Sequence, residues 1–282
     1  MYKLFLIKRI LVTLIFLILA GCNPIETPVQ KTGPTYLSLS PASTEIVYAL
    51  ESESNLVGVT DYCNHPEEAK TKKSVGNFMN PSLEVIFLLN PDIVFEPGLP
   101  QDSILNQITN KGIEVITVNP GSIDQLKKDI LRLGKITQKK EKSKKLIADI
   151  ERQIKSVKKK TDQVDKKRVY VEIASNPMMT VGSESFITEL IEIGGGINVA
   201  GQVKKDYFTT GYEFIVSRNP EIIVLLSKNS KVRKEQFSRF FSSSQSPEIK
   251  TVSQEEKDIL LRAGPRIGEG AKRIFDIIHD EK

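Results

Sequence analysis

Cysteine, histidine and tryptophan are scarce in this chain of 282 residues. It holds two cysteines, two histidines and no tryptophan. Two cysteines cannot build a framework of disulfide bonds, and two histidines argue against a histidine-rich metal site. The rest of the composition, 39% hydrophobic and 27% charged, is that of a globular protein. The length suits one large domain or two of ordinary size.

The sequence also lacks a recognisable set of catalytic residues. His279 belongs to the C-terminal tail, and His65 stands in a turn two residues after Cys63. No Ser-His-Asp set and no His-Glu-x-x-His pair can be assembled from them. Asp61, Cys63 and His65 could in principle hold a metal ion, but such residues in a Pro-bounded loop are more often surface residues. We therefore expect a protein that is not an enzyme and carries neither a metal nor a cofactor.

Positive charge is concentrated in one segment. The formal net charge is +5, and residues 127–168 hold seventeen Lys or Arg against six Asp or Glu. A protein that binds nucleic acid needs positive charge across its working surface. Here the surplus belongs to one helix-forming segment, so we expect no nucleic acid partner. The basic face is expected to be solvated, with contact to anionic lipid as the alternative.

The N-terminus has the features of a secretory signal. Three basic residues among the first nine precede an apolar run over residues 10–20, which is too short to span a membrane. The run ends in Leu19-Ala20-Gly21-Cys22, which resembles the bacterial lipoprotein box, where the cysteine thiol receives a diacylglycerol. An ordinary signal with a chance cysteine is the alternative. We expect Cys22 to be the lipidation site, followed by a flexible tether rich in Pro and Thr.

An internal duplication organises the remainder of the chain. Phe78 and Glu84 recur as Tyr207 and Glu213, both at an offset of 129 residues, and Asn-Pro, an acidic residue and an apolar run follow each pair. We expect each Glu to open a short helix and each Asn-Pro to end it, because the residue before Pro avoids the α region. Each apolar run then predicts a buried parallel strand. Two unrelated helix-to-strand turns are the alternative.

Other segments complete an α/β pattern. Strands are expected at residues 36–40, 57–60, 115–118 and 169–173, and a helix at residues 186–193, where three glycines end it. Residues 139–160 have apolar side chains at helical spacing and predict a helix about 30 Å long. The predicted fold class is therefore α/β, with two lobes joined by a long bridging helix and a ligand cleft between the lobes.

The expected division of the chain follows from these patterns. It comprises a signal peptide (1–21), a tether (22–34), an N-terminal α/β lobe (35–122), linking helices (123–165) and a C-terminal α/β lobe (166–282).

Several motifs resemble those of periplasmic binding proteins for cobalamin and iron-siderophore importers. They are Ser40-Pro41-Ala42-Ser43-Thr44-Glu45, residues 57–66, residues 75–84, Pro91-Asp92-Ile93-Val94 and Arg262-Ala263-Gly264-Pro265-Arg266-Ile267. The resemblance spans roughly residues 35–275 and is nearest to the cobalamin-binding branch. It implies the helical-backbone architecture of class III substrate-binding proteins, with limited hinge motion.

The resemblance also implies a function and partners. The chain is expected to be a monomeric, lipid-anchored protein that delivers cobalamin to an ABC permease dimer and its ATPase. Its place would be the periplasm or the outer face of the cell membrane. An iron-siderophore or haem-binding protein of the same family is the alternative. An anchored enzyme such as a hydrolase, or a metal-ion binder, fits the residues less well.

Residue roles follow from the matched positions. Glu84 and Glu213 match the family's permease-docking carboxylates, although they could be helix-start residues only. The ligand-binding residues implied are Asp61, Tyr62, Phe78, Met79, Met179 and Tyr207. Phe78 and Tyr207 stand where the relatives often carry Trp; either could belong to the core, as could Met178 or Met179. Siderophores would favour Arg or Lys in the cleft, and the predicted rim, residues 61–66 and 76–84, has none.

Overall fold

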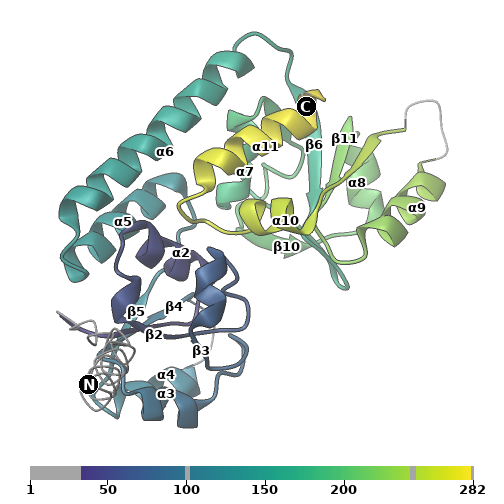
Figure 1. Ribbon diagram of the computed structural model, residues 1–282. Helices are drawn as coiled ribbons and strands as arrows, with labels where there is room; N and C mark the ends of the chain where they lie inside the picture. Colours follow the sequence, from purple (N-terminus) through teal and green to yellow (C-terminus); the bar gives the residue numbers. More distant parts are fainter. Residues whose placement is uncertain (1–32, 99–101, 242–245, 281–282) are drawn as a thin grey trace, which may run out of the picture. The chain divides into compact units, whose positions relative to one another are not determined.

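Two parallel sheets form the framework of the protein in the computed structural model, which describes residues 33–98, 102–241 and 246–280 (Figure 1). The first sheet contains β1 (Tyr36–Ser38), β2 (Leu56–Val59), β3 (Lys73–Ser74), β4 (Ile93–Glu96) and β5 (Glu114–Thr117). The second contains β6 (Lys167–Glu172), β9 (Gly196–Asn198), β11 (Ile222–Leu225) and β12 (Glu248–Thr251). The strand orders are β3-β2-β1-β4-β5 and β12-β11-β6-β9. The predicted signal sequence, Cys22 and most of the tether lie outside the described residues.

Helices cover these sheets and connect them. The helices of the first half of the chain are α2 (Pro41–Ala49), α3 (Leu83–Leu89) and α4 (Asp102–Thr109). The connection consists of α5 (Ile123–Ile136) and α6 (Lys140–Thr161). The helices of the second half are α7 (Phe186–Ile193), α8 (Tyr212–Arg218), α9 (Ser230–Phe240), α10 (Gln254–Leu260) and α11 (Ile267–His279). The predicted bridging helix at 139–160 and the helix at 186–193 are confirmed, and Gly194 caps the latter.

A third, antiparallel sheet belongs to the second half of the chain. It pairs β8 (Met178–Val181) with β10 (Tyr207–Thr209) on one side and with β7 (Ala174–Ser175) on the other. The sequence patterns did not predict this sheet. Its pairing places Tyr207 opposite Val181, the last residue of β8.

The internal duplication is confirmed as two copies of one helix-strand unit. The unit α3–β4 and the unit α8–β11 keep the offset of 129 residues at every boundary. In each copy, the strand of the unit pairs in parallel with the first strand of its sheet, β4 with β1 and β11 with β6. The two sheets therefore share a core order, β2-β1-β4-β5 matching β9-β6-β11-β12.

Both helices of the repeat end in the same unusual way. Asn90 and Asn219 are the C-caps, and they adopt left-handed conformations with φ of 42° and 47°. Helix termination at Asn-Pro was thus predicted correctly, but the reason was wrong. Instead of moving to the extended region that a residue before Pro prefers, Asn turns the chain through the left-handed region, which it tolerates better than most residues.

One hydrophobic cluster runs through both halves of the described chain. It joins Tyr36 and Phe95 of the first sheet to Val169 and Val224 of the second and includes side chains from α5, α6, α7 and α11. Helix α6 packs against α5 and against α11, which lies beside it (Figure 1). Smaller clusters cover the other face of each sheet, under α3 and α4 in the first and under α8 and α9 in the second. Since close-packed cores resist deformation, this continuity favours limited movement between the halves.

In the parts of the chain that the structure describes, no helix combines the length and apolar character needed to cross a bilayer.

Candidate ligand-binding site

A pocket opens at the carboxyl ends of the strands in the first sheet. Its cavity volume is about 270 Å³. The first half of the chain contributes residues that follow β1, β4 and β5, together with Phe78; these are Leu39, Ser40, Pro41, Ala42, Pro97, Val118, Asn119, Pro120 and Gly121. Loops at the carboxyl ends of parallel strands are the usual ligand site in open α/β sheets. The fold itself therefore places the pocket here.

The second half of the chain closes the same pocket. Ser185 and Phe186 at the start of α7 line it, as do Asp206 and Tyr207 at the start of β10. The turn between α10 and α11 supplies Leu261, Arg262 and Ala263. The pocket is thus built by residues from both α/β units, as a cleft between two lobes requires.

Phe78 and Tyr207, the two aromatic residues at equivalent positions of the repeat, both line this pocket. Tyr62 extends the aromatic surface, because its ring meets Phe78 edge-on with a centroid separation of 5.1 Å. Tyr62 and Tyr207 are 47% and 42% exposed, so their rings are open to a ligand. Aromatic faces of this kind suit a large flat ligand through apolar contact and stacking.

The other predicted ligand residues do not line the pocket. The Asp61 carboxylate accepts a hydrogen bond from the Ser74 hydroxyl, and Met79 is exposed. Met179 lies within β8, opposite Ala174 and Thr209. The neighbouring Met178 packs against the cluster under α8 and α9.

Tyr207 keeps its proton at physiological pH. Desolvation by the surrounding protein raises the pKa of its phenol, and the neighbouring Asp206 carboxylate adds to this shift. A hydrogen bond with Ser185 acts in the opposite direction. The phenol therefore offers a neutral polar edge to the pocket.

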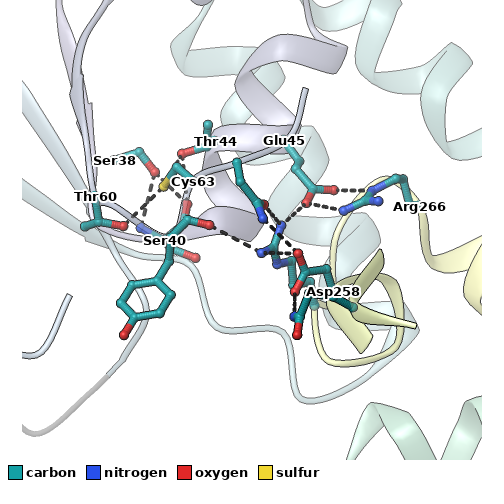
Figure 2. A network of polar contacts seen from close by, with 12 residues as sticks. Ser38, Ser40, Thr44, Glu45, Thr60, Cys63, Asp258 and Arg266 are labelled. Atoms are coloured by element: carbon teal, nitrogen blue, oxygen red, sulfur yellow. Dashed lines mark hydrogen bonds and ion pairs between the residues drawn. The ribbon is translucent and has the colours of Figure 1, made fainter. Parts of the chain in front are cut away.

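A buried ion-pair network reaches the pocket through Arg262, and Figure 2 shows Glu45 and Arg266 of this network facing each other. The Glu45 side chain is 2% exposed and accepts hydrogen bonds from Arg262 at 3.1 Å and from Arg266 at 2.7 and 2.9 Å. Glu45 belongs to α2, whereas the two arginines flank the turn that leads into α11. The network therefore fastens the first half of the chain to the second beside the ligand pocket.

Arg262 connects this network to the aromatic surface. Its guanidinium donates to the Asn64 side chain at 2.7 Å and to the Tyr62 carbonyl at 3.3 Å, and pairs with Asp258 at 3.1 Å. It thereby holds the loop that presents Tyr62 to Phe78. The rim predicted from residues 61–66 and 76–84 lacked basic residues, but the pocket itself contains Arg262. Arg262 pairs with Asp258 and with Glu45, which it shares with Arg266.

Cys63 is structural. The residue is 2% exposed, more deeply buried than the sequence indicated, and its Sγ accepts a hydrogen bond from Thr44 at 3.1 Å. Burial raises the pKa of the thiol, while hydrogen bonds with Thr44 and Thr60 partly offset the shift. Within residues 33–98, 102–241 and 246–280, no group of three or more His, Cys, Asp or Glu residues is arranged to hold a metal ion.

Glu84 and Glu213 lie away from the pocket lining. Each is the second residue of its short helix, α3 or α8, and each side chain is exposed. This placement agrees with the prediction that the two carboxylates open equivalent helices.

Several pocket residues escaped the sequence analysis. Ser185, Asp206 and the segment 118–121 belong to no motif that pointed to a ligand. The signal that could have found residues 118–121 is their position at the carboxyl end of the strand predicted at 115–118, at the edge where ligands bind. Fold and pocket together define a two-lobed α/β binding protein.

Comparison with known proteins identifies the family. Residues 37–253 match the family model described as periplasmic binding protein. An uncharacterized ABC transporter substrate-binding lipoprotein of Bacillus subtilis, YvrC, is 27% identical over 91% of this chain and 83% of its own. The vitamin B12-binding protein of Salmonella typhi is 29% identical over 87% of this chain and 90% of its own. Among solved structures, the periplasmic haem-binding protein HutB of Vibrio cholerae has a TM-score of 0.75 at 19% identity, covering 88% of this chain and 100% of its own.

The chain belongs to the periplasmic binding protein family. The expected resemblance and the class III fold are thus confirmed. The family consists of extracytoplasmic solute-binding proteins rather than enzymes.

Proposed function

We propose that this protein is the substrate-binding component of an ABC importer and that its ligand is cobalamin. The observation that carries the proposal is the meeting of Phe78 and Tyr207 in one pocket, contributed by equivalent positions of the two repeats. A flat macrocycle can contact both rings at once. The cavity of about 270 Å³ is smaller than a corrin, so the macrocycle would lie across its mouth.

The charge of the pocket supports cobalamin over its alternatives. Arg262 and Asp206 are the charged residues among those that line the cavity. Because the carboxylates of Glu45 and Asp258 balance the charges of Arg262 and Arg266, little positive charge is available for the carboxylates of haem or of an anionic siderophore. A corrin edged by neutral amides fits this pocket better.

Visible spectroscopy tests the ligand directly. Residues 23–282, which omit Cys22, are mixed with cyanocobalamin, desalted and measured by absorbance, with calorimetry in parallel. The proposal expects the corrin spectrum to stay with the protein at one ligand per chain. Retention of haemin or a ferric siderophore, but not of cyanocobalamin, would replace cobalamin with that ligand. Retention of none of them would overturn the proposed ligand class.

The proposal includes a lipid anchor at Cys22. The Leu-Ala-Gly-Cys sequence at the end of the apolar run supports it, since two acyl chains suffice for stable attachment. Mass spectrometry of the mature N-terminal peptide should show a diacylglyceryl group on Cys22. In the Cys22→Ser variant the protein should leave the membrane fraction.

Docking to the permease is assigned to Glu84 and Glu213. Their equivalent places in the two repeats suit a permease with two similar subunits, each of which would offer an arginine. One exposed ion pair contributes only about 0.2–1 kcal/mol, but two pairs on separate lobes also fix orientation and favour encounter. Replacing both carboxylates should spare ligand binding and reduce transport.

A further inference from the structure

The helices α3 and α8 present equivalent surfaces to solvent. Each has seven residues, an exposed Glu at its second position and a left-handed Asn at its end. Ile86 and Ile215, the buried residues of the two helices, occupy matching positions and face the sheets. The opposite faces therefore remain available to a partner.

An apolar side chain stands beside the carboxylate on each of these faces. Leu88 is 81% exposed, the highest value among the large hydrophobic side chains of the described chain, and Val216 is 46% exposed. Leu88 follows Glu84 by four residues and Val216 follows Glu213 by three, so each pair shares one side of its helix. A single exposed hydrophobic residue needs no explanation. Leu88 and Val216 do not occupy equivalent positions of the repeat, because Leu88 corresponds to Ser217. Both copies nevertheless carry an exposed apolar side chain beside the carboxylate, and this recurrence does call for an explanation.

The two carboxylates are not used within the described protein. Among the described residues, neither Glu84 nor Glu213 has a hydrogen-bond or ion-pair partner. Two basic side chains near these helices contact aromatic rings of α3 and α8: Lys111 lies 5.5 Å from the Phe87 ring centre and Arg218 lies 5.2 Å from that of Phe214. Charge and apolar surface are thus both left for an external partner.

We propose that Leu88 and Val216 are apolar docking contacts that shield the Glu84 and Glu213 ion pairs from water in the complex with the permease. The inference rests on the proposed docking role of the two carboxylates. Water and salt weaken an exposed ion pair, whereas exclusion of water strengthens it. Each permease subunit would therefore carry a basic side chain bordered by apolar surface.

Charge complementarity selects this partner over two others. A second copy of the chain would bring carboxylates against carboxylates, and an anionic lipid surface would repel them. A partner with two similar subunits and a basic residue on each matches both surfaces at once.

The test measures binding of the ligand-loaded chain to its permease and ATPase, reconstituted together in lipid nanodiscs. The variants are Leu88→Gln and Val216→Thr, alone and combined. Leu131→Gln on α5 and Val232→Thr on α9 are matched controls, because these side chains are 45% and 54% exposed. The combined docking variant should bind the permease roughly tenfold more weakly, from the apolar area left in water. The controls should bind like the parent chain.

The energetic coupling between Glu84 and Leu88 shows whether Leu88 shields the ion pair or only adds an independent apolar contact. Glu84→Gln is combined with Leu88→Gln in a double-mutant cycle, and the effects should be less than additive, because the shield serves the carboxylate. The Leu88 variant should also bind with a steeper dependence on salt than the parent chain. Strict additivity with an unchanged salt dependence would overturn the shielding role.

The paired variant Glu84→Gln with Glu213→Gln distinguishes the two proposals. If this variant docks poorly while Leu88→Gln with Val216→Thr docks normally, the apolar inference is wrong and the docking role stands. If both combined variants dock like the parent chain, the docking role and the inference fall together.

Discussion

The Asp92 carboxylate accepts two hydrogen bonds from Thr35, one from the backbone N–H at 2.7 Å and one from the hydroxyl at 2.8 Å. This contact ties the entrance of β4 to the entrance of β1. Its counterpart in the second repeat is Glu221, whose carboxylate accepts from the backbone N–H of Arg168 at 2.8 Å, where β11 meets β6. The acidic residue after Asn-Pro therefore sets the pairing of two central strands in both sheets.

The hydrogen bonds from Thr35 make the contribution of Asp92 to stability depend on pH. They lower the pKa of the Asp92 carboxyl, so its stabilising effect is present above the unfolded pKa of about 4 and is lost as the pH falls through the lower folded pKa. The Asp92→Asn variant should lose less than about 1 kcal/mol of unfolding free energy at pH 7, because the group is exposed.

Urea unfolding of Asp92→Asn and of the parent chain between pH 2 and pH 7 measures this effect. The difference between the two proteins should shrink towards the acid end. Asp165→Asn, which changes an exposed acid before β6, is the control and should match the parent chain throughout. A difference for Asp92→Asn that does not depend on pH would contradict the assignment.

The fold was predictable where the signals are local. Glu84 and the Asn90-Pro91 dipeptide predict the start and the end of α3 to within a few residues. Because the sequence repeats, the same signals predict α8 and β11. The antiparallel sheet was not predictable from the sequence. Apolar and polar residues do not alternate strictly in Met178–Val181, and the strand that pairs with it, β10, lies more than twenty residues further along the chain. Long-range pairing of short strands leaves little trace in a local pattern.

The buried thiol of Cys63 should be unreactive in the folded protein. Burial raises its pKa and leaves it largely protonated, and the thiolate is the reactive form. In the chain that begins at residue 23, where Cys63 is the one cysteine, a thiol reagent at pH 8 should label it slowly in buffer and completely in denaturant. Rapid stoichiometric labelling in buffer would show that the loop carrying Cys63 opens readily.

Phe78 and Tyr207 should each contribute to ligand affinity without supporting the fold. Phe78→Ala or Tyr207→Ala should weaken cyanocobalamin binding by roughly five- to thirtyfold, given an aromatic contact worth about 1–2 kcal/mol. Calorimetry measures the affinity, and thermal unfolding checks stability. Ile197→Ala, at a side chain 49% exposed on β9, is the control and should bind normally. Unchanged affinity in both aromatic variants would remove the basis of the proposed site.

The candidate site was only partly predictable, for a physical reason. The repeat marked Phe78 and Tyr207 as equivalent positions, because it gives them equal spacing from Glu84 and Glu213, and the family resemblance implied that they bind the ligand. Arg262 received no role in the cleft, since its partner Glu45 lies 217 residues away in the sequence and only the folded chain brings them together.

The Glu45 network should be the most sensitive polar contact near the pocket. Glu45→Gln leaves the guanidinium groups of Arg262 and Arg266, 12% and 16% exposed, with one carboxylate fewer in a site that excludes water. Removing one member of a buried ion pair typically costs about 3–5 kcal/mol. Urea unfolding at pH 7 should show a loss of this order.

A surface ion pair on the same stretch of chain provides the comparison. Glu269 and Arg273 of α11 lie 3.5 Å apart with side chains 40% and 41% exposed, so Glu269→Gln should cost at most about 1 kcal/mol. Glu45→Gln should also release cyanocobalamin faster, because Arg262 holds the Tyr62 loop against Phe78. Equal losses of stability in the two variants would mean that water reaches Glu45, and the network would then not fasten the two halves of the chain.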